Sequence, residues 1–399
     1  MQRHTILFMA EAVTLAHLAR PLALAQRLDP QRYALHLASA VGYDAFFAGS
    51  PVQRWPLRSI SSAQFLAALA AGKPVYDAAT LEGYVEEDLQ LLSALRPALV
   101  IGDFRLSLAV SARLAQVPYV ALSNAYWSPY VRQHYRVPSL ALSRVLPLAL
   151  ADGLFRAVRP LAFALHTLPL NQVRRRHGLA SLGWDLRRLY TEGDRTLYAD
   201  IPELFAPQQM PASHSYLGPV LWSPPVALPA WWASLPAGRP LVYVTLGSSG
   251  QGALLAGVLR ALARLPVTVV AATAGRVALD AVPENAHVAP FLPGDVVTQR
   301  ASLVICNGGS PTSQQALAAG VPVLGIAANL DQFLNMGALL AAGAGQLLRA
   351  DRFDEQRLRQ AAEQLLASAS ARAAAQRIAV WFRQYDTGQR LQAVLQQLI

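Results

Sequence analysis

The sequence contains one cysteine, Cys306, and one lysine, Lys73, among its 399 residues. A single cysteine excludes an internal disulfide and a cysteine-rich metal cluster, and it is typical of a protein from a reducing compartment. Because lysine is almost absent, the formal net charge of +10 comes from arginine. The guanidinium group binds phosphate and carboxylate through a planar fork, so nucleic acid has to be considered as a partner.

Long apolar runs are also missing, although hydrophobic residues make up 53% and charged residues only 15% of the chain. No stretch approaches the roughly 20 apolar residues of a membrane-spanning helix; the run 145–151 lies between Arg144 and Asp152. The segment before Glu11 carries no long apolar region of the signal-peptide type. We therefore expect a cytoplasmic protein, and the hydrophobic content excludes a disordered chain.

The motifs of nucleic-acid-binding proteins and metalloenzymes are absent as well. The chain has no zinc-ligand spacing and no aromatic RNA-binding motif, and its arginines are dispersed apart from the run 174–176. No two histidines form an i, i+4 pair with an acid. We therefore predict no nucleic-acid partner and no metal site, with most arginines on solvated surfaces.

A membrane surface is a separate possibility. A helix is predicted after Pro147, with Asp152, Arg156 and Arg159 on one face and apolar residues over most of the rest. A basic stripe on an apolar helix can lie on an anionic membrane, which would mean peripheral contact at the inner face of the membrane. A core helix with a solvated basic stripe fits the same pattern, so both alternatives stay open.

The order of predicted elements indicates two α/β domains. Short buried-strand patterns alternate with helical patterns in each half of the chain, which is typical of parallel sheets covered on both faces. The strands are expected at 5–9, 33–39, 97–103 and 117–122, and again at 240–246, 267–272, 303–306 and 322–326. Between the halves, residues 206–240 are rich in proline, which is a linker composition.

We predict an N-terminal domain at 1–215, a linker at 216–235, a C-terminal domain at 236–380 and a final helix at 381–399 that returns to the first domain. Ligands of open α/β sheets bind beyond the carboxyl ends of the strands, so the two sheets are expected to face each other across a ligand cleft.

The most informative stretch is 307–322, where a predicted strand ends in Gly308 and Gly309 and hydroxyl residues then open a helix. Glycines let a ligand approach the backbone, and a helix N-terminus offers unbonded N–H groups and the positive end of the helix dipole. This pattern favours phosphate binding. An ordinary helix cap at Ser310 with a first-turn proline at 311 is the alternative.

A wider set of motifs resembles the family 1 glycosyltransferases, which transfer sugars from UDP- or dTDP-sugars with inversion and have the GT-B fold of two Rossmann-like domains. The family string runs His-Gly-Gly-x-Gly-Thr, Glu-Ala-Leu, Gly-Val-Pro, Asp-Gln. This chain has Asn-Gly-Gly-Ser-Pro-Thr at 307–312, Gln-Ala-Leu at 315–317, Gly-Val-Pro at 320–322 and Asp-Gln at 331–332. Three further segments resemble family elements in the same order: 216–220, 244–249 and 289–293.

The resemblance implies a donor site on the second domain. The diphosphate would lie on the N–H groups of Gly309, Ser310 and Thr312, with Ser248 and Ser249 opposite. Asp331 and Gln332 would bind sugar hydroxyls, and Phe291 would cover the base. No metal or other cofactor is expected, because the helix N-terminus can balance the leaving charge and the chain has no Asp-x-Asp pair.

Three positions depart from the family pattern. Asn307 stands in place of the usual histidine, Pro311 in place of a glycine, and Gln315 in place of the glutamate that would hold the ribose hydroxyls. Amides can still bond to phosphate and ribose, whereas proline removes one N–H donor. These departures are the best support for an alternative, a non-catalytic protein that binds nucleotide sugars or a partner. A nucleotide-sugar epimerase is a third reading.

The first domain supplies the candidate catalytic pair. His17, near the start of the first predicted helix, matches the family histidine that deprotonates the acceptor. Asp103, at the end of the strand 97–103, matches the aspartate that orients this histidine. An unperturbed histidine has a pKa of about 6.5, which suits a general base near neutral pH. The alternatives are a helix-capping or core role for His17 and a helix cap at the strand end for Asp103.

The acceptor is expected to be a hydrophobic small molecule with a reactive hydroxyl group. Residues 126–170 fit the family pattern least and are predicted to line its pocket. Aromatic walls suit planar or greasy ligands. The aromatic cluster that could form such walls comprises Tyr119, Tyr126, Trp127, Tyr130 and Tyr135, and packing in the core is the alternative for most of them.

Overall fold

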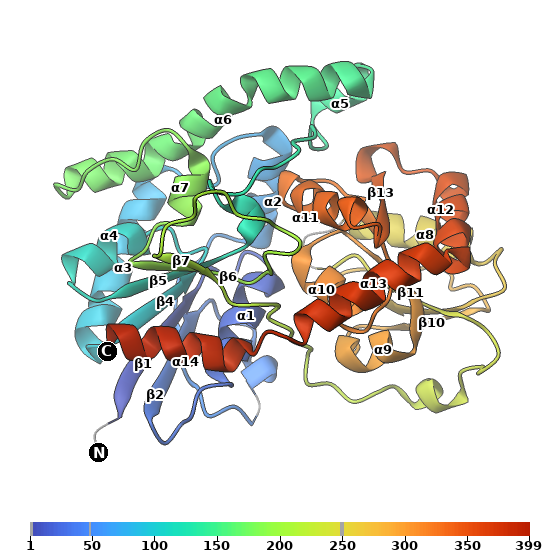
Figure 1. Ribbon diagram of the computed structural model, residues 1–399, viewed down its shortest axis with the longest axis horizontal. Coiled ribbons are helices and arrows are strands. Elements are labelled where there is room, and N and C mark those ends of the chain that lie inside the picture. The colour runs from blue at the N-terminus through green and yellow to red at the C-terminus, as the bar shows by residue number, and fades with distance from the viewer. Residues whose placement is uncertain (1–2, 48, 248–250) are drawn as a thin grey trace. The chain divides into compact units, whose positions relative to one another are not determined.

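The computed structural model describes residues 3–47, 49–247 and 251–399, which form two compact units (Figure 1). The first unit comprises Met1–Gln133, Arg156–Val220 and Tyr385–Ile399. The second comprises His134–Phe155 and Leu221–Gln384. None of the described helices has the length and apolar character needed to cross a bilayer.

The first unit is built on a seven-stranded sheet in the order β3-β2-β1-β4-β5-β6-β7, with neighbouring strands parallel. Its strands are β1 (His4–Ala10), β2 (Tyr33–Ser39), β3 (Gln53–Pro56), β4 (Leu99–Asp103), β5 (Tyr119–Ser123), β6 (Arg195–Tyr198) and β7 (His214–Tyr216). The strand order reverses between β1 and β4, and such a switch point leaves a crevice at the carboxyl ends of the two strands.

The second unit repeats this plan with a six-stranded sheet in the order β10-β9-β8-β11-β12-β13. Its strands are β8 (Leu241–Thr245), β9 (Thr268–Ala272), β10 (Ala286–Ala289), β11 (Ala301–Cys306), β12 (Val323–Ala327) and β13 (Gly345–Arg349). Here the order reverses between β8 and β11, whose carboxyl ends carry Gly247 and Asn307. The predicted α/β class with two parallel sheets is confirmed.

Helices connect the strands in both units. Those of the first unit are α1 (Leu15–Ala25), α2 (Ser62–Ala71), α3 (Ala78–Leu95), α4 (Leu108–Leu114), α7 (Leu186–Tyr190) and α14 (Thr387–Leu398). Those of the second are α5 (Ala141–Val145), α8 (Leu255–Leu262), α9 (Gly294–Arg300), α10 (Ser310–Ala318), α11 (Leu330–Ala341), α12 (Glu355–Ala367) and α13 (Ala369–Phe382). The long helix α6 (Leu148–Arg176) begins in the second unit and continues in the first.

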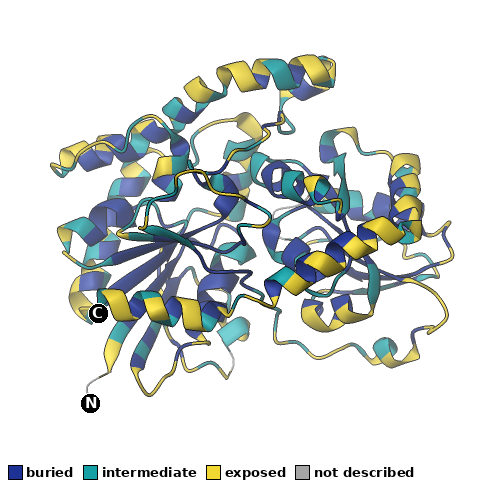
Figure 2. Ribbon diagram, in the orientation of Figure 1, coloured by how far each residue is buried: buried dark blue, intermediate teal, exposed yellow. Residues whose placement is uncertain are grey.

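The central strands are buried on both faces, as the continuous apolar patterns predict. In Figure 2 they are almost wholly dark blue, and residues 6–10 of β1 have no exposed surface. Parallel sheets covered on both faces have this composition, because neither face meets water. The carboxyl ends of the strands are therefore where polar side chains become accessible.

The division into units differs from the sequence-based boundary at 1–215 in one segment. Residues His134–Phe155 belong to the second unit, where Arg349 donates to the carbonyl of Val137 at 2.7 Å and Arg352 to that of Ser143 at 2.8 Å. The bonds join residues about 210 positions apart, which no local pattern reveals. The C-terminal residues Tyr385–Ile399 lie in the first unit, where Arg390 donates to the Tyr216 carbonyl at 3.2 Å.

Candidate active site

The switch point of the first unit brings His17 and Asp103 together. Asp103 is the last residue of β4 and lies beside Ala10 of β1 in the sheet register. His17 is in the first turn of α1, the helix that follows β1. Its Nδ1 is 2.7 Å from the Asp103 Oδ1. The Asp103 side chain is 1% exposed and the His17 side chain 19%, so the ring is reachable and the carboxylate is not.

A third residue, Arg20, binds the carboxylate of this pair. The sequence analysis did not predict it. Its Nε donates to Asp103 Oδ2 at 2.9 Å and its Nη2 to Oδ1 at 2.8 Å, which is the bidentate arrangement of a strong ion pair. Burial alone would lower the pKa of Arg20. The charge and hydrogen bonds of Asp103 raise this pKa by more, so its net shift is upward. The same Nη2 lies 3.2 Å from His17 Nδ1, so all three groups form one cluster.

The cluster extends to the ends of the next two strands. Arg20 Nη1 donates to the Asn124 side chain, and the Asn124 amide donates to Asp200 at 3.0 Å. Asn124 follows β5 and Asp200 follows β6. Because Asp103 ends β4 and these two residues lie just beyond β5 and β6, the cluster spans the carboxyl edge of the sheet from β4 to β6. Arg20 is three residues after His17, which places both on one face of α1.

Aromatic side chains extend from His17 in what we call the aromatic row: Phe104, Tyr190, Trp127 and Phe163. The Phe104 ring stacks on His17 with centroids 4.8 Å apart and planes 14° apart. Tyr190 lies 5.3 Å from Phe104 and 5.0 Å from Trp127, which is 6.4 Å from Phe163. An apolar ligand along this row would end beside the histidine.

Phe104 also has an unusual backbone. Its φ is 59°, in the left-handed region that a bulky residue rarely adopts. Such strain, typically about 1–3 kcal/mol, persists only where the surroundings hold it. Here it turns the chain directly after Asp103 and sets the Phe104 ring against His17. Of the aromatic residues singled out in the sequence, only Trp127 belongs to the row; Tyr119, Tyr126 and Tyr135 are buried in the core.

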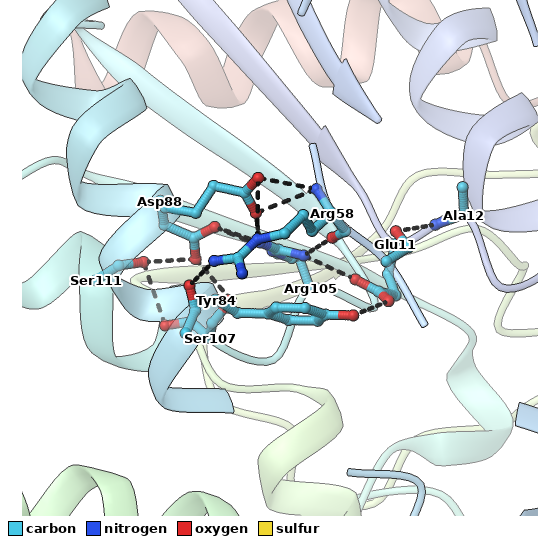
Figure 3. Close-up of polar contacts among 11 residues, drawn as sticks. Glu11, Ala12, Arg58, Tyr84, Asp88, Arg105, Ser107 and Ser111 are labelled. Atoms are coloured by element: carbon cyan, nitrogen blue, oxygen red, sulfur yellow. Dashed lines mark hydrogen bonds and ion pairs between the residues drawn. The ribbon is translucent and has the colours of Figure 1, made fainter. Parts of the chain in front are cut away.

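A buried ion network holds the loops that follow β1 and β4, of which the first leads to His17 and the second comes directly after Asp103 (Figure 3). We call it the Arg105 network. The guanidinium of Arg105 is bound to Glu11 at 3.0 Å, Asp88 at 2.9 Å and Glu87 at 3.1 Å, and it lies 3.8 Å from the centre of the Tyr84 ring. Arg105, Glu11 and Asp88 have no exposed side-chain surface. Arg105 follows Phe104, and Glu11 follows β1, so the network fixes both loops to α3.

The charges of this network depend on one another. Burial raises the pKa values of Glu11 and Asp88, although nearby Arg105 opposes the shift for each. Burial alone would lower the pKa of Arg105, but the charges of Asp88 and Glu11 raise it well above its ordinary value. Asp88 also accepts from the hydroxyls of Ser107 at 2.6 Å and Ser111 at 3.0 Å. No group of three or more His, Cys, Asp or Glu side chains suited to a metal ion occurs within the described ranges.

The switch point of the second unit carries the glycine-rich turn predicted as the diphosphate site. β11 ends at Cys306, Gly309 is the N-cap of α10, and Ser310 begins the helix. Asn307 Oδ1 accepts from the Gly309 N–H at 3.1 Å. Asn335 in α11 donates to the Gly308 carbonyl at 2.8 Å and to the Ser313 hydroxyl at 2.9 Å. These bonds tie the turn and α10 to α11. The Gly309 N–H, which the sequence analysis assigned to the diphosphate, is thus bonded to Asn307 in this structure.

Replacing Gly308 with alanine is expected to distort this turn. Gly308 has a φ of 80°, and a Cβ atom there would lie 2.8 Å from Cγ of Met336. We expect Gly308→Ala to lower stability by roughly 1–3 kcal/mol and to weaken nucleoside diphosphate binding, both measured by thermal unfolding with and without ligand. Gly337→Ala in α11 is the control, because nothing lies within 4 Å of its Cβ position. Equal behaviour of the two variants would show that the turn tolerates a side chain.

The other predicted donor residues are placed as follows. Ser248 and Ser249 lie outside the described residues. The ring of Phe291 is beside Gly275, whose Cβ position would be 3.6 Å from it. Gln315 Nε2 donates to the carbonyl of Trp222 and, at 3.1 Å, to the Ser223 hydroxyl, so this amide is bonded to the segment that follows the first unit. Thr312 lies in the first turn of α10.

Asp331 and Gln332 lie in the first turn of α11. Gln332 Oε1 accepts from the N–H groups of Ala328 at 2.8 Å and Asn329 at 3.3 Å, so it forms a capping box with Asn329. Its Nε2 is buried and makes no hydrogen bond within the described part of the chain. The oxygen of this amide is therefore committed to the helix cap, while the nitrogen remains as a donor.

The single cysteine is a structural residue. Cys306 is buried at the end of β11, where its sulfur accepts from the Gly308 N–H at 3.3 Å. Burial raises the pKa of its thiol to about 12, so the thiolate is not formed near neutral pH. Cys306 helps to shape the glycine-rich turn and is unsuited to act as a nucleophile.

The chain is similar in sequence to one protein family and to several glycosyltransferases. Residues 256–382 match the family described as "Erythromycin biosynthesis protein CIII-like, C-terminal domain". The chain is 53% identical to a "PGL/p-HBAD biosynthesis rhamnosyltransferase" of Mycobacterium bovis (strain BCG / Pasteur 1173P2) over 378 residues, 95% of this chain and 84% of that protein. It is 51% identical to a "PGL/p-HBAD biosynthesis glycosyltransferase" of Mycobacterium tuberculosis (strain ATCC 25177 / H37Ra) over 381 residues, 96% and 89% of the two chains.

Solved structures agree on the fold. The "Spinosyn Rhamnosyltransferase SpnG" superposes with a TM-score of 0.72 at 21% identity, covering 99% of this chain and 100% of that one. The same enzyme has been solved "complexed with thymidine diphosphate" and "complexed with spinosyn aglycone", at TM-scores of 0.71 and 0.72. These likenesses confirm the predicted GT-B fold.

Proposed function

The chain belongs to the family of PGL/p-HBAD biosynthesis glycosyltransferases and is itself a glycosyltransferase, and from this premise we propose how it works. It moves a sugar from a UDP- or dTDP-sugar to a hydroxyl group of a hydrophobic acceptor, with inversion at the anomeric carbon and with His17 as the general base. A rhamnosyl group is the first sugar to test, because the relative from Mycobacterium bovis is named as a rhamnosyltransferase.

The observation that supports this proposal most directly is the contact between His17 and Asp103. The carboxylate holds Nδ1 at 2.7 Å, which leaves Nε2 for the acceptor. In the proposed step Nε2 takes the proton of the acceptor hydroxyl as its oxygen attacks the anomeric carbon. The bond from that carbon to the diphosphate breaks, and the nucleoside diphosphate leaves with the electron pair. Asp103 balances the imidazolium that forms, as in other histidine–carboxylate pairs.

The aromatic row supplies the acceptor side of the proposal. It starts with the Phe104 ring stacked on His17 and continues to Phe163, which is 6% exposed. Flat aromatic walls bind apolar ligands with little loss of side-chain freedom. An acceptor whose apolar body lay along this row would present its hydroxyl group to Nε2 of His17.

Donor binding is expected to persist without a divalent metal. On the proposed site, the leaving diphosphate is balanced by the N-terminus of α10 and its backbone N–H groups. We expect the dissociation constant of the nucleoside diphosphate, measured by calorimetry, to change less than about twofold after treatment with a chelator. Loss of binding that magnesium restores would contradict this account of the diphosphate site.

Gln332 and Asp331 are expected to act on the sugar alone. Gln332→Glu keeps an oxygen for the helix cap but has no Nε2 donor, so we expect the affinity for the nucleotide sugar to fall about tenfold. The affinity for the free nucleoside diphosphate should stay unchanged, and Asp331→Ala should behave in the same way. Calorimetry with both ligands makes the comparison. An equal loss for both ligands would move these residues out of the sugar site.

One assay separates the proposal from its two rivals. A glycosyltransferase releases nucleoside diphosphate at a rate that depends on the acceptor. A non-catalytic binding protein would bind the nucleotide sugar and release nothing, and an epimerase would convert the donor without an acceptor. We expect release from dTDP-rhamnose or a related donor only when a hydrophobic phenol or alcohol is present.

A further inference from the structure

The helix α6 carries a row of exposed apolar side chains, which we call the α6 stripe. Its members are Leu150 (63% exposed), Leu154 (45%), Val158 (43%), Leu161 (65%), Leu165 (50%) and Leu168 (40%). At 3.6 residues per turn these six positions fall within an arc of about 80° and extend over about 27 Å of helix. Figure 2 shows exposed residues, in yellow, along α6 from one end to the other.

The opposite side of α6 packs into the protein. Phe163, Thr167, Leu170 and Val173 are buried, with exposures of 6% or less. Arg174, also buried, donates to the carbonyl of Ala180 at 2.7 Å. Of the predicted basic stripe, Arg156 is exposed, and the sequence analysis did not predict the exposed apolar stripe. It is the apolar stripe that faces water, while Asp152 accepts from the Val137 N–H at 2.7 Å and Arg159 lies 5.0 Å from the Phe163 ring centre.

Basic and aromatic groups surround the α6 stripe. Arg175 and Arg176 are exposed and lie about two turns beyond Leu168 along the line of the stripe, and the exposed Arg144 precedes the other end of α6. Trp184 follows α6 and is 64% exposed. Leucine over a long apolar arc with arginine at its ends is the composition of helices that lie in the surface of an anionic membrane.

We propose that the α6 stripe docks the protein on an anionic lipid surface. The leucines enter the boundary between headgroups and acyl chains, while the arginines bind lipid phosphates. Charge favours this occupant over a second copy of the chain. Two copies meeting through the stripe would bring arginines of the same sign together, and the only acidic side chain of α6, Asp152, is already bonded to Val137.

Docking would also place the acceptor route next to the lipid. Phe163, the last member of the aromatic row, lies on the buried side of the helix that carries the stripe. The end of the aromatic row would then lie about one helix diameter, ~10 Å, from the lipid, which shortens the path of a membrane-dissolved acceptor to His17. This consequence rests on the proposed function, whereas docking itself does not, so the experiment below measures binding to lipid without any transfer reaction.

The test is co-sedimentation of the full-length protein with vesicles. We expect it to bind vesicles of an equal mixture of phosphatidylglycerol and phosphatidylcholine, and to bind less tightly at high ionic strength or to pure phosphatidylcholine. The double variant Leu161→Gln/Leu165→Gln should lower the partition coefficient by about tenfold or more. Arg175→Gln should lower it by about fivefold on the mixed vesicles only.

The matched control is Val282→Gln/Val380→Gln, which changes two apolar residues with exposures of 46% and 48% outside α6. It should bind vesicles as the unaltered protein does, and thermal unfolding should show that all variants fold. Three results would overturn the proposal: no vesicle binding by the unaltered protein, equal binding by the stripe variant and the control, or a dimer in solution that the stripe variant dissociates.

Discussion

Replacing His17 with alanine is expected to lower turnover by about 10²–10⁴-fold, the usual contribution of a positioned acid–base group. The variant loses the only proposed proton acceptor at the end of the aromatic row. Affinity for the donor should barely change, because the proposed diphosphate site lies on the second unit. The measurement is acceptor-dependent release of nucleoside diphosphate, together with donor affinity by calorimetry.

Asp103→Asn tests whether the histidine acts together with the carboxylate. It should lose less activity than His17→Ala, since the imidazole remains while its orientation and charge balance are lost. The losses should not add in the double variant, because residues that act as one unit give non-additive effects. His4→Ala, at an exposed position at the start of β1, is the control and should retain full turnover. If folded His17→Ala kept near-full turnover, the base would lie elsewhere.

The pairing of His17 with Asp103 was predicted from the family resemblance, and the strand patterns that precede His17 and contain Asp103 explain why the two residues meet. The patterns at 5–9 and 97–103 correspond to β1 and β4, which are neighbours in the sheet. Residues at the carboxyl ends of neighbouring parallel strands meet at one edge. The glycine-rich turn after β11 was found for the same reason, since its signal is local and lies in consecutive residues.

Short strands at and near the sheet edges were missed. The strands β3, β6, β7, β10 and β13 have three to five residues each, and several contain charged or polar positions. Such segments form because a neighbouring strand offers backbone hydrogen bonds, rather than because of their own pattern. The assignment of His134–Phe155 to the second unit likewise depends on side chains from Arg349 and Arg352.

The supporting groups of the site were also missed. Arg20 and Arg105 carry no motif, and the acids that they bind lie 83 and 17 to 94 positions away in sequence. A weak signal was present for both. Arg20 lies one turn after His17, and Arg105 lies two residues after Asp103. Their positions in the sequence therefore place each arginine close to the pair. Only the structure shows that these arginines are buried with carboxylates rather than solvated.

Replacing Arg105 with methionine is expected to give the largest loss of stability of any single change considered for the first unit, about 3–5 kcal/mol. Methionine fills a similar volume but leaves the buried carboxylates of Glu11 and Asp88 without their cation. Each must then either remain charged in an apolar environment or take up a proton. Urea unfolding followed by tryptophan fluorescence measures the loss.

The control is Arg58→Met, which removes an arginine that is 65% exposed and lies 3.5 Å from Glu87. An exposed pair of this kind contributes at most about 1 kcal/mol. A second-site change separates charge from packing: Glu11→Gln added to Arg105→Met removes one of the stranded carboxylates and should recover part of the lost stability. Turnover should fall in Arg105→Met even where the protein is folded, because the network holds the loops that lead to His17 and follow Asp103. A variant as stable and as active as Arg58→Met would show that these loops are positioned by the sheet alone.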